Sequence, residues 1–392
     1  MSGELLYLDP HDVMLAADEV DAVDAVREAL ALHALGKAEI ASEAYLGWSP
    51  GSGGAARSIS MPGLLAGEPP AIGVKIINAN TANPASGLPR ASGLIVIFDP
   101  DTARPVCVMA ASHISALRTA AVSVLASQTL ITPGAATAAI TGAGPLAREH
   151  CLLIAERIPQ IAEIGVFDTI PGRAGDLCQE LAGRLPPGRA RLKVAASARS
   201  AIERCDLLIT CTTTRQAYVE RGWLKQGAVA VNVSLDDLCA DVLMSADRLY
   251  VDDWGLIADD EHRLLGHLAR AGRVLPPGTP DASPGTRAVT GTLGQLILGQ
   301  CQGRQSDAEL CVVNPFGLAI EDVNVAHRIY QAALRRQIGG SLPFLSRPQM
   351  RPRPTRRWNH GHDRRTAPAA QGRAAGGLLS GGPAAAGRPV RR

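Results

Sequence analysis

The chain has 392 residues, of which 46% are hydrophobic and only 3% are aromatic. That length allows two domains of ordinary size, and their cores must be built from Ala, Val, Leu and Ile. The formal net charge of +2 is unevenly distributed, because residues 343–392 hold eleven Arg and one Asp. Residues 1–342 are therefore mildly acidic, which argues against a nucleic-acid-binding surface on the folded part.

Residues 343–392 are rich in Arg, Pro, Gly and Ala and lack apolar periodicity, so we expect a disordered basic tail. The eight cysteines form no CxxC pair and no metal-ligand spacing, which predicts reduced thiols and no metal site. The start MSGELLYLDPHD has no signal-peptide pattern, and no apolar run reaches transmembrane length. We expect a cytoplasmic protein that binds neither membrane nor nucleic acid.

The first part of the chain mixes strand and helix patterns. LLYLD begins a short strand, and apolar residues recur with a helical period over 11–36. Three further strand-like runs follow a glycine-rich loop, and a long small-residue helix follows them. The runs are AIGVKII (71–77), GLIVIFD (93–99) and VCVMA (106–110), and the helix covers 111–126.

From about Ala135 the pattern changes to apolar strands that alternate with helices. The expected strands are 135–141, 162–168, 191–197, 206–213 and 228–234, and the helices between them are 145–157, 172–185 and 197–205. Near-continuous apolar strands in this alternation predict a parallel sheet covered on both faces, an α/β fold. After Val251 the alternation fades, and residues 286–300 and 316–338 are expected to form two closing helices.

A glycine motif marks the first turn of this alternating part. ITGAGPLAREH contains Gly142-x-Gly144-x-x-Ala147 directly after an apolar strand. Gly142 permits the tight turn, Gly144 lets the backbone approach a pyrophosphate, and Ala147 keeps the next helix close to the strand. Pro145 suits the first helical position, and Leu146 lies in the same turn. The helix N-terminus would face the phosphates of a dinucleotide.

The next strand ends in Asp168, which lies 21 residues beyond Ala147. Its carboxylate can accept hydrogen bonds from both ribose hydroxyls and would repel a 2′-phosphate, so NAD is favoured over NADP. Other residues are placed near the cofactor by their position at the ends of later strands. These are Thr212, Thr213, Val233 and Ser234.

Three cations indicate a pocket for an amino-acid substrate. Arg57 follows the glycine-rich loop, Lys75 lies inside an apolar strand, and Arg118 lies in the small-residue helix. An arginine fork can grip a carboxylate with two bonds, and a buried lysine can help to move protons. Each cation also has a structural interpretation, in which the lysine extends to water and an arginine pairs with an internal carboxylate.

VNVSLDDLCAD supplies Asp236 and Asp237 immediately after a strand end, where the active sites of parallel sheets gather. One of them could hold an amino group and carry a proton while a hydride leaves the substrate carbon. The alternative is that both carboxylates only cap the next helix. The sequence does not choose between Asp236 and Asp237.

Several of these segments, in this order, resemble the ornithine cyclodeaminase/μ-crystallin family. The matching stretches are GVKIINANTANPASGLPRASGLIVIFD with the ALRTAA helix, then ITGAGPLA, VNVSLDDL and NPFGLAIEDVNVAHRIYQAA. The resemblance covers roughly residues 5–340. It implies a Rossmann-type parallel-sheet NAD domain (118–289) inserted in an α+β substrate-binding and dimerisation domain (1–117 plus 290–342), with residues 343–392 as the tail. It also implies a homodimer.

The resemblance also implies roles for individual residues. Arg57, Lys75 and Arg118 match the family positions that hold the substrate carboxylate, and Asp237 matches the catalytic aspartate, with Lys75 as a second group that manages protons. The chain has SLDDLCAD where the family usually has Gly-Asp-x-Pro-Gly.

The SLDDLCAD stretch, together with NPFGLAIED, resembles a branch of NAD-dependent dehydrogenases that make 2,3-diaminopropionate for siderophores or peptide antibiotics. The branch cleaves the secondary amine that joins diaminopropionate to glutamate. The alternatives are a cyclodeaminase or imine reductase, and a non-catalytic dinucleotide-binding protein.

Overall fold

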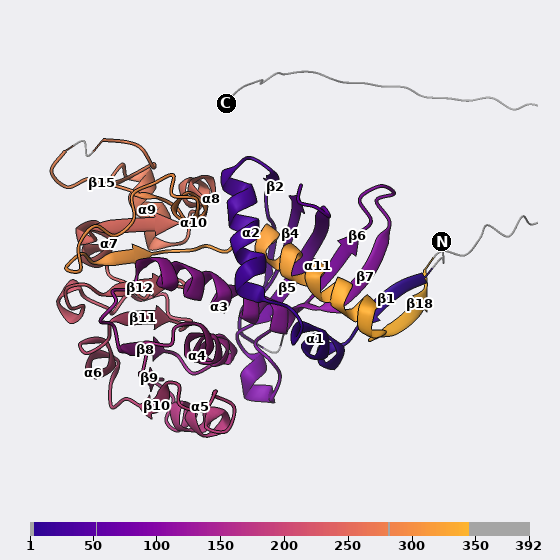
Figure 1. Cartoon of the computed structure of the whole chain (residues 1–392), viewed down its shortest axis with the longest axis horizontal. Helices are drawn as coiled ribbons and strands as arrows, with labels where there is room; N and C mark the ends of the chain where they lie inside the picture. Colours follow the sequence, from indigo (N-terminus) through magenta and orange to yellow (C-terminus); the bar gives the residue numbers. More distant parts are fainter. Residues whose placement is uncertain (1–3, 52, 281–282, 345–392) are drawn as a thin grey trace, which may run out of the picture. The chain divides into compact units, whose positions relative to one another are not determined.

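The structure, a computed structural model, describes residues 4–51, 53–280 and 283–344 (Figure 1). The expected disordered tail lies almost entirely outside the described residues. Residues 4–344 contain two large sheets, each with its own helices.

The first sheet has the order β18-β1-β7-β6-β5-β4-β2, and β3 also pairs with β4. Only β1 and β7 run parallel among its described pairs, so the sheet is mixed. Its strands are β1 (Glu4–Leu8), β2 (Ala38–Ile40), β3 (Ala44–Trp48), β4 (Ala56–Leu65), β5 (Ala71–Asn80), β6 (Ala91–Phe98), β7 (Pro105–Ala110) and β18 (Gly340–Pro343).

The helical period over 11–36 divides into two helices, α1 (Pro10–Ala17) and α2 (Ala22–Ala34). The break comes at Asp21, whose side chain accepts a hydrogen bond from the N–H of Asp24 at 3.0 Å and so caps the second helix. A single helix was expected here because aspartate caps inside an apolar period are easily missed.

Helix α3 (Ala111–Leu130) begins directly after β7 and connects the two sheets. Thirteen of its residues are buried, which explains its small and apolar composition. Buried His150 of α4 (Pro145–Arg157) lies 2.9 Å from the Ser123 hydroxyl and 2.7 Å from the Leu146 carbonyl. Burial lowers the pKa of His150 to about 4, so a neutral imidazole ties α4 to α3.

The second sheet has the order β10-β9-β8-β11-β12-β17-β13-β16, and its described strand pairs are all parallel. The α/β class with a Rossmann-type sheet is confirmed. Its strands are β8 (Thr137–Thr141), β9 (Glu163–Phe167), β10 (Arg191–Val194), β11 (Leu207–Thr210), β12 (Val229–Asn232), β13 (Arg248–Val251), β16 (Gly291–Thr292) and β17 (Cys311–Val313).

Helices cover both faces of this sheet, as a buried parallel sheet requires. Alternate strand residues belong to different apolar clusters: Ile140 packs with α3 and α4, whereas Ala139 packs with the helices of the other face. The helices of the other face are α6 (Ala198–Ile202), α7 (Ala240–Ser245), α8 (Trp254–Asp259) and α9 (Leu264–Arg270), whereas α5 (Arg173–Leu181) packs on the side of α3 and α4.

The chain returns to the first sheet later than its sequence predicts. Residues 290–342 were expected to belong to the substrate domain, but β16 and β17 lie in the second sheet, with β17 between β12 and β13. Strand β17 is three residues long, and a run as short as CVV gives little strand signal. The expected helix over 286–300 shrinks to α10 (Leu293–Ile297), because β15 (Arg287–Ala288), which pairs with β14 (Val274–Leu275), and then β16 precede it.

Helix α11 (Ala319–Arg336) lies across the first sheet (Figure 1). A Cβ on Gly63 or Gly73 would contact Ile320 or Val323 of this helix at 3.1 and 3.5 Å, so small strand residues let α11 approach closely. One apolar cluster runs from Leu8 of β1 through α3 to Val231 of β12 and Ile329 of α11. No helix in the described residues is long and apolar enough to cross a membrane.

Candidate active site

The turn after β8 has the geometry that its glycines predict. Gly142 has φ +90°, and a Cβ there would lie 2.6 Å from the carbonyl oxygen of Cys211, so only glycine fits. Its N–H donates to the Phe167 carbonyl at 2.7 Å, which holds the turn between β8 and β9.

Gly144 is the N-cap of α4, and no described atom lies within 4 Å of where its Cβ would be. Pro145 is the first residue of the helix, Leu146 is half-buried, and Ala147 is fully buried. The N-terminus of α4 therefore has no side-chain cap and open space in front of it, as a pyrophosphate would need.

Asp168 lies beside this turn at the end of β9. One carboxylate oxygen accepts from the N–H of Ala143 at 2.8 Å, and the other accepts from the N–H of Ile170 at 2.8 Å. These bonds fix the carboxylate next to the glycine turn and leave lone pairs on both oxygens. The residues present fit the dinucleotide that the motif implies.

The other predicted cofactor residues lie at the carboxyl ends of β11 and β12. Thr212 and Ser234 are half-buried, and the Ser234 hydroxyl donates to the Thr210 carbonyl at 2.8 Å. Thr213 is exposed and Val233 is half-buried.

Asp237 is fully buried at this same edge. Its Oδ1 accepts from the hydroxyls of Thr212 at 2.7 Å and Tyr218 at 3.2 Å, whereas its Oδ2 is buried without a partner among the described residues. Burial raises the pKa of Asp237, against the hydrogen bonds from Thr212 and Tyr218. The carboxylate is thus oriented through one oxygen and has the other free for a proton.

Asp236 has a different environment. It is half-exposed, and its Oδ1 accepts from the N–H of Leu264, the first residue of α9, at 2.8 Å. Asp236 therefore bonds to the N-terminus of α9 and not to the next helix, α7, while Asp237 contacts hydroxyl groups at the strand ends.

Lys75 and Arg118 lie together, and both are paired with carboxylates of α11. The Lys75 ammonium bonds to Asp322, and Arg118 donates from Nη1 to Glu321 Oε2 at 2.6 Å and from Nε to Asp322 Oδ1 at 3.2 Å. Arg118 is 7% exposed, and both carboxylates are fully buried. The internal-partner interpretation of Arg118 thus describes this structure, in which the two cations are already compensated.

Burial shifts the protonation of this cluster. It raises the pKa of Glu321 to about 7, since burial outweighs the attraction of Arg118. It lowers the pKa of Lys75, against the charge of Asp322. The pair Glu321–Arg118 can therefore change its charge near neutral pH.

Arg57 lies apart from this cluster. It faces Ala79 across β4 and β5, four residues along β5 from Lys75 and on the same face of the sheet. Arg57 forms no ion pair with any residue that the structure describes. Arg90, which precedes β6 two strands away, is close enough for the charge of Arg57 to lower its pKa, after the larger effect of burial.

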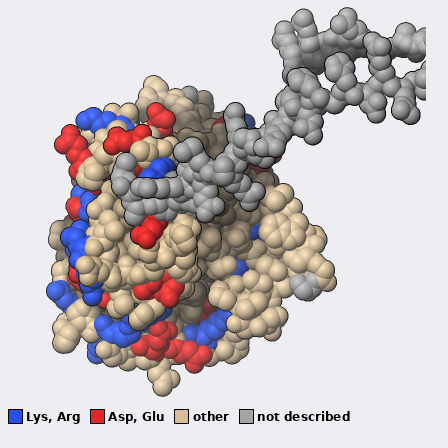
Figure 2. Space-filling model, turned by 90° about the vertical axis from the view of Figure 1, so that its right-hand side faces the viewer, with Lys and Arg blue, Asp and Glu red and all other residues tan. Residues whose placement is uncertain are grey.

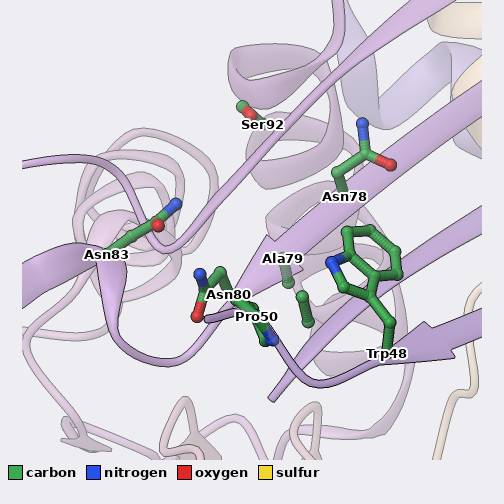
Figure 3. A pocket seen from close by; sticks show the side chains of 8 residues that line it. Trp48, Pro50, Asn78, Ala79, Asn80, Asn83 and Ser92 are labelled. Carbon is green, nitrogen blue, oxygen red and sulfur yellow. The ribbon is translucent and has the colours of Figure 1, made fainter. Parts of the chain in front are cut away.

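The ends of these strands also border a cavity of about 250 Å³. In Figure 3, Trp48 and Asn78 lie on one side of it and Asn83 on the other, with Asn80 between them. By strand alternation, Asn78 and Asn80 point to the face opposite Lys75, so this cavity lies on the sheet face that α11 does not cover.

Sequence reasoning missed several charged residues of the site. Glu321 and Asp322 lie in NPFGLAIED, where an acidic pair opening an otherwise apolar helix is the signal that could have found them. Glu43 and Arg263 carry no such signal, because each comes from an irregular loop. Arg263 packs over the ring of Phe316 at 4.0 Å, and a Cβ on the neighbouring Gly317 would lie 2.6 Å from Arg118 Nη1.

Comparison with known proteins decides the family, because the profile of the "Ornithine cyclodeaminase/mu-crystallin family" matches residues 6–337. The chain belongs to this family. It is 34% identical over 348 residues to N-((2S)-2-amino-2-carboxyethyl)-L-glutamate dehydrogenase of Staphylococcus aureus (strain NCTC 8325 / PS 47), covering 87% of this chain and 99% of that protein.

Two solved structures are similar to this chain. The crystal structure of CmnK has a TM-score of 0.79 at 34% identity and covers 88% of this chain and 100% of CmnK. An archaeal alanine dehydrogenase dimer with bound NAD has a TM-score of 0.72 at 28% identity, covering 87% and 100% of the two chains. The chain is an NAD-dependent amino-acid dehydrogenase, as its sequence predicted.

Proposed function

We propose that the chain uses NAD and water to cleave N-(2-amino-2-carboxyethyl)-L-glutamate into L-2,3-diaminopropionate and 2-oxoglutarate, with NADH and a proton as the other products. One observation carries the proposal: the S. aureus dehydrogenase named for this substrate aligns with the chain over 99% of its own length. The buried Asp237, with its unpartnered Oδ2, supports a proton transfer at this edge of the second sheet.

The chemistry is divided between cofactor and protein. Bound NAD would supply the acceptor for the hydride of the glutamate α-carbon. Asp237 Oδ2 accepts the proton of the secondary amine as the C–N bond becomes an imine. Water then adds to the imine carbon, the C–N bond breaks, and the proton returns to the departing amine of diaminopropionate.

The hydroxyls around Asp237 have a positioning role in this scheme. Thr212 and Tyr218 hold Oδ1, so the free oxygen keeps one direction. Because burial raises the pKa of Asp237, the protonated form costs less than it would in water. Lys75, whose pKa burial lowers, is the second group that we propose to move protons.

The cofactor would be held by the turn 142–147 and by Asp168. Gly144 leaves space for the pyrophosphate at the uncapped N-terminus of α4. The Asp168 carboxylate has lone pairs left for the adenosine ribose hydroxyls. Thr212, Thr213, Val233 and Ser234 would line the other half of the cofactor at the ends of β11 and β12.

The substrate carboxylates would be held by Arg57, Arg118 and Lys75. Arg57 has no ion pair within the described chain, so its charge is available to an anion. Arg118 and Lys75 are compensated by Glu321 and Asp322, and a substrate carboxylate would share them with these residues. Protonation of Glu321, whose pKa is about 7, would release Arg118 for that purpose.

We also propose a homodimer formed through the uncovered face of the first sheet. Large apolar side chains are exposed there, with Leu46 64%, Trp48 48% and Leu94 45% exposed. The right-hand part of Figure 2 is mostly free of charged residues. The alanine dehydrogenase with bound NAD is a dimer, which supports a dimer here, and the exposed apolar residues indicate this face as its interface.

We also propose that the enzyme works in the cytoplasm. None of the eight cysteines is in a disulfide, which suits the reducing cytoplasm. The product would feed the biosynthesis of a siderophore or a peptide natural product.

The test is an assay of purified protein with NAD and the conjugate, following NADH and 2-oxoglutarate. Equal amounts of both products are expected. Ammonia release from ornithine without net NADH would instead identify a cyclodeaminase, and oxidation of NADH by a cyclic imine would identify a reductase. Tight binding of NADH without turnover of any of these substrates would mean a non-catalytic protein.

A further inference from the structure

The acidic residues around Lys75, Arg118 and Arg263 differ in whether they have a hydrogen-bond partner. Asp322 and Glu321 bond to the two cations, and Asp252 accepts from the N–H groups of Phe316 and Gly317. Two further carboxylates accept from backbone N–H groups, Asp236 and Asp260. Glu43 alone among these six makes no hydrogen bond or ion pair with any residue in the described chain.

Strand register places Glu43 at the level of Lys75. Ile40 pairs with Gly63 and Ala44 pairs with Ser60, so residues 41–43 pass beside Met61 and Pro62 of β4. Met61 in turn pairs with Lys75. Two strand spacings, about 10 Å, therefore separate Glu43 from Lys75 across the sheet.

Alternation also places Glu43 on the correct face of the sheet. Ala44 and Ser60 share the face opposite Met61 and Lys75, so the alternation of β3, continued one residue back, puts Glu43 on the face of Lys75. Residues 41–43 face only Met61 and Pro62 and form an irregular bulge between β2 and β3, so alternation counted from Ile40 does not extend to Glu43. That face is covered by α11, whose Asp322 bonds to Lys75. The charges of Lys75, Arg263 and Arg118 act on the Glu43 carboxylate, in agreement with this placement.

The charges of the cluster favour a cationic ligand. Three cations, Lys75, Arg118 and Arg263, lie among six carboxylates, and Glu43 is solvent-exposed. An accessible, unbonded carboxylate in a surplus of negative charge is suited to an ammonium group, which has three donors and no acceptor.

We propose that Glu43 binds the primary ammonium group of the substrate, the 2-amino group of its 2-amino-2-carboxyethyl arm. This assignment rests on the proposed function for the identity of the substrate. It makes Glu43 a specificity-determining residue, which distinguishes conjugates that carry this amino group from conjugates that lack it. The loss of a hydrogen bond between two charged groups predicts a change in KM of about 10- to 100-fold.

The test compares Glu43→Gln with Glu39→Gln, its matched control. Glu39 is exposed on the neighbouring β2 and pairs with Leu64, on the opposite face of the sheet. For the conjugate, Glu43→Gln should raise KM about 10- to 100-fold with kcat nearly unchanged. The wild type should show the same rise with N-(2-carboxyethyl)-L-glutamate, which lacks the amino group, and Glu43→Gln should add nothing to it.

A second measurement does not depend on turnover. Calorimetric titration of the NADH-loaded wild type should show tighter binding of L-2,3-diaminopropionate than of 3-aminopropionate, and Glu43→Gln should remove that preference. Failure of the wild type to turn over the conjugate, with this preference intact, refutes the proposed function but not the ammonium site.

The inference is overturned if Glu43→Gln shows the same KM and the same ligand preference as Glu39→Gln. A rise in KM that is equally large for the analogue without the amino group also overturns it. Glu43→Asp guards against a structural effect, because it keeps the charge and should give a KM between those of the wild type and Glu43→Gln.

Discussion

Replacement of Arg118 by alanine should destabilise the protein strongly. The substitution removes the 2.6 Å bond to Glu321 and the 3.2 Å bond to Asp322. Both carboxylates are fully buried. Glu321 would keep only a 3.2 Å bond from the Leu318 N–H, and Asp322 would keep only Lys75. Water cannot replace the lost bonds without opening the core around the first turn of α11.

The expected cost follows from removing one partner of a buried ion pair, which amounts to about 3–5 kcal/mol. Protonation of Glu321 limits the loss, because its pKa is already about 7. Each kcal/mol corresponds to a few degrees in a protein of this size class, so Tm should fall by roughly 10 °C. Thermal unfolding followed by circular dichroism, without substrate, is the appropriate assay.

A second variant separates charge from packing. The double variant Arg118→Ala with Glu321→Gln should recover part of the lost stability, because it removes the buried carboxylate that has lost its cation, whereas Asp322 keeps Lys75. A Tm for Arg118→Ala equal to that of the wild type would refute the reasoning. It would mean that Arg118 contributes nothing to the fold and acts only on ligands.

Three other predictions concern the remaining parts of the site. Asp237→Asn should lower kcat by about 10²- to 10⁴-fold without lowering Tm, since burial already disfavours its charge; full activity would contradict its role. Gly142→Ala should lower both Tm and NADH affinity, because φ is +90° and the Cβ would lie 2.6 Å from a carbonyl oxygen. Gly144→Ala should lower only the NADH affinity, measured by NADH fluorescence, because its Cβ would meet no described atom within 4 Å. Burial raises the folded-state pKa of Glu321 from 4.5 to about 7. The wild type should therefore lose about 3 kcal/mol of folding stability relative to Glu321→Gln as the pH rises through that interval. A Tm difference between the two proteins that does not change between pH 5 and 8 would refute this prediction.

Much of the fold could be predicted because its elements carry local signals. Helix α4 begins and ends at the predicted residues, since Pro145 opens it after a glycine turn. Strands β5, β6 and β7 are apolar runs between turn residues and lie within a few residues of their predicted bounds. The short strand β17 could not be predicted, because its place between β12 and β13 is a long-range pairing that three residues do not encode.

Some contacts of the candidate site could also be predicted from the sequence, and others could not. The glycine turn and Asp168 follow one another closely in the chain, so spacing alone predicts their contact. Arg118 and its partners Glu321 and Asp322 are more than 200 residues apart, and the need for an anion was predictable while its source was not. Glu43 depends on the register of β2 and β3 against β4, which has no local signal.

Helix α3 has a consequence for how this protein can be cut or recombined. It starts at the edge of one sheet, ends beneath the other, and shares one continuous apolar core with both. A fragment that ends before α3 or begins after it would expose a long apolar surface, and neither half should be obtainable as an independent piece. A nucleotide-binding half taken from a relative would bring its own α3, and with it the residue that meets Glu321 and Asp322. Exchange of cofactor modules within this family would therefore carry part of the proposed substrate site along.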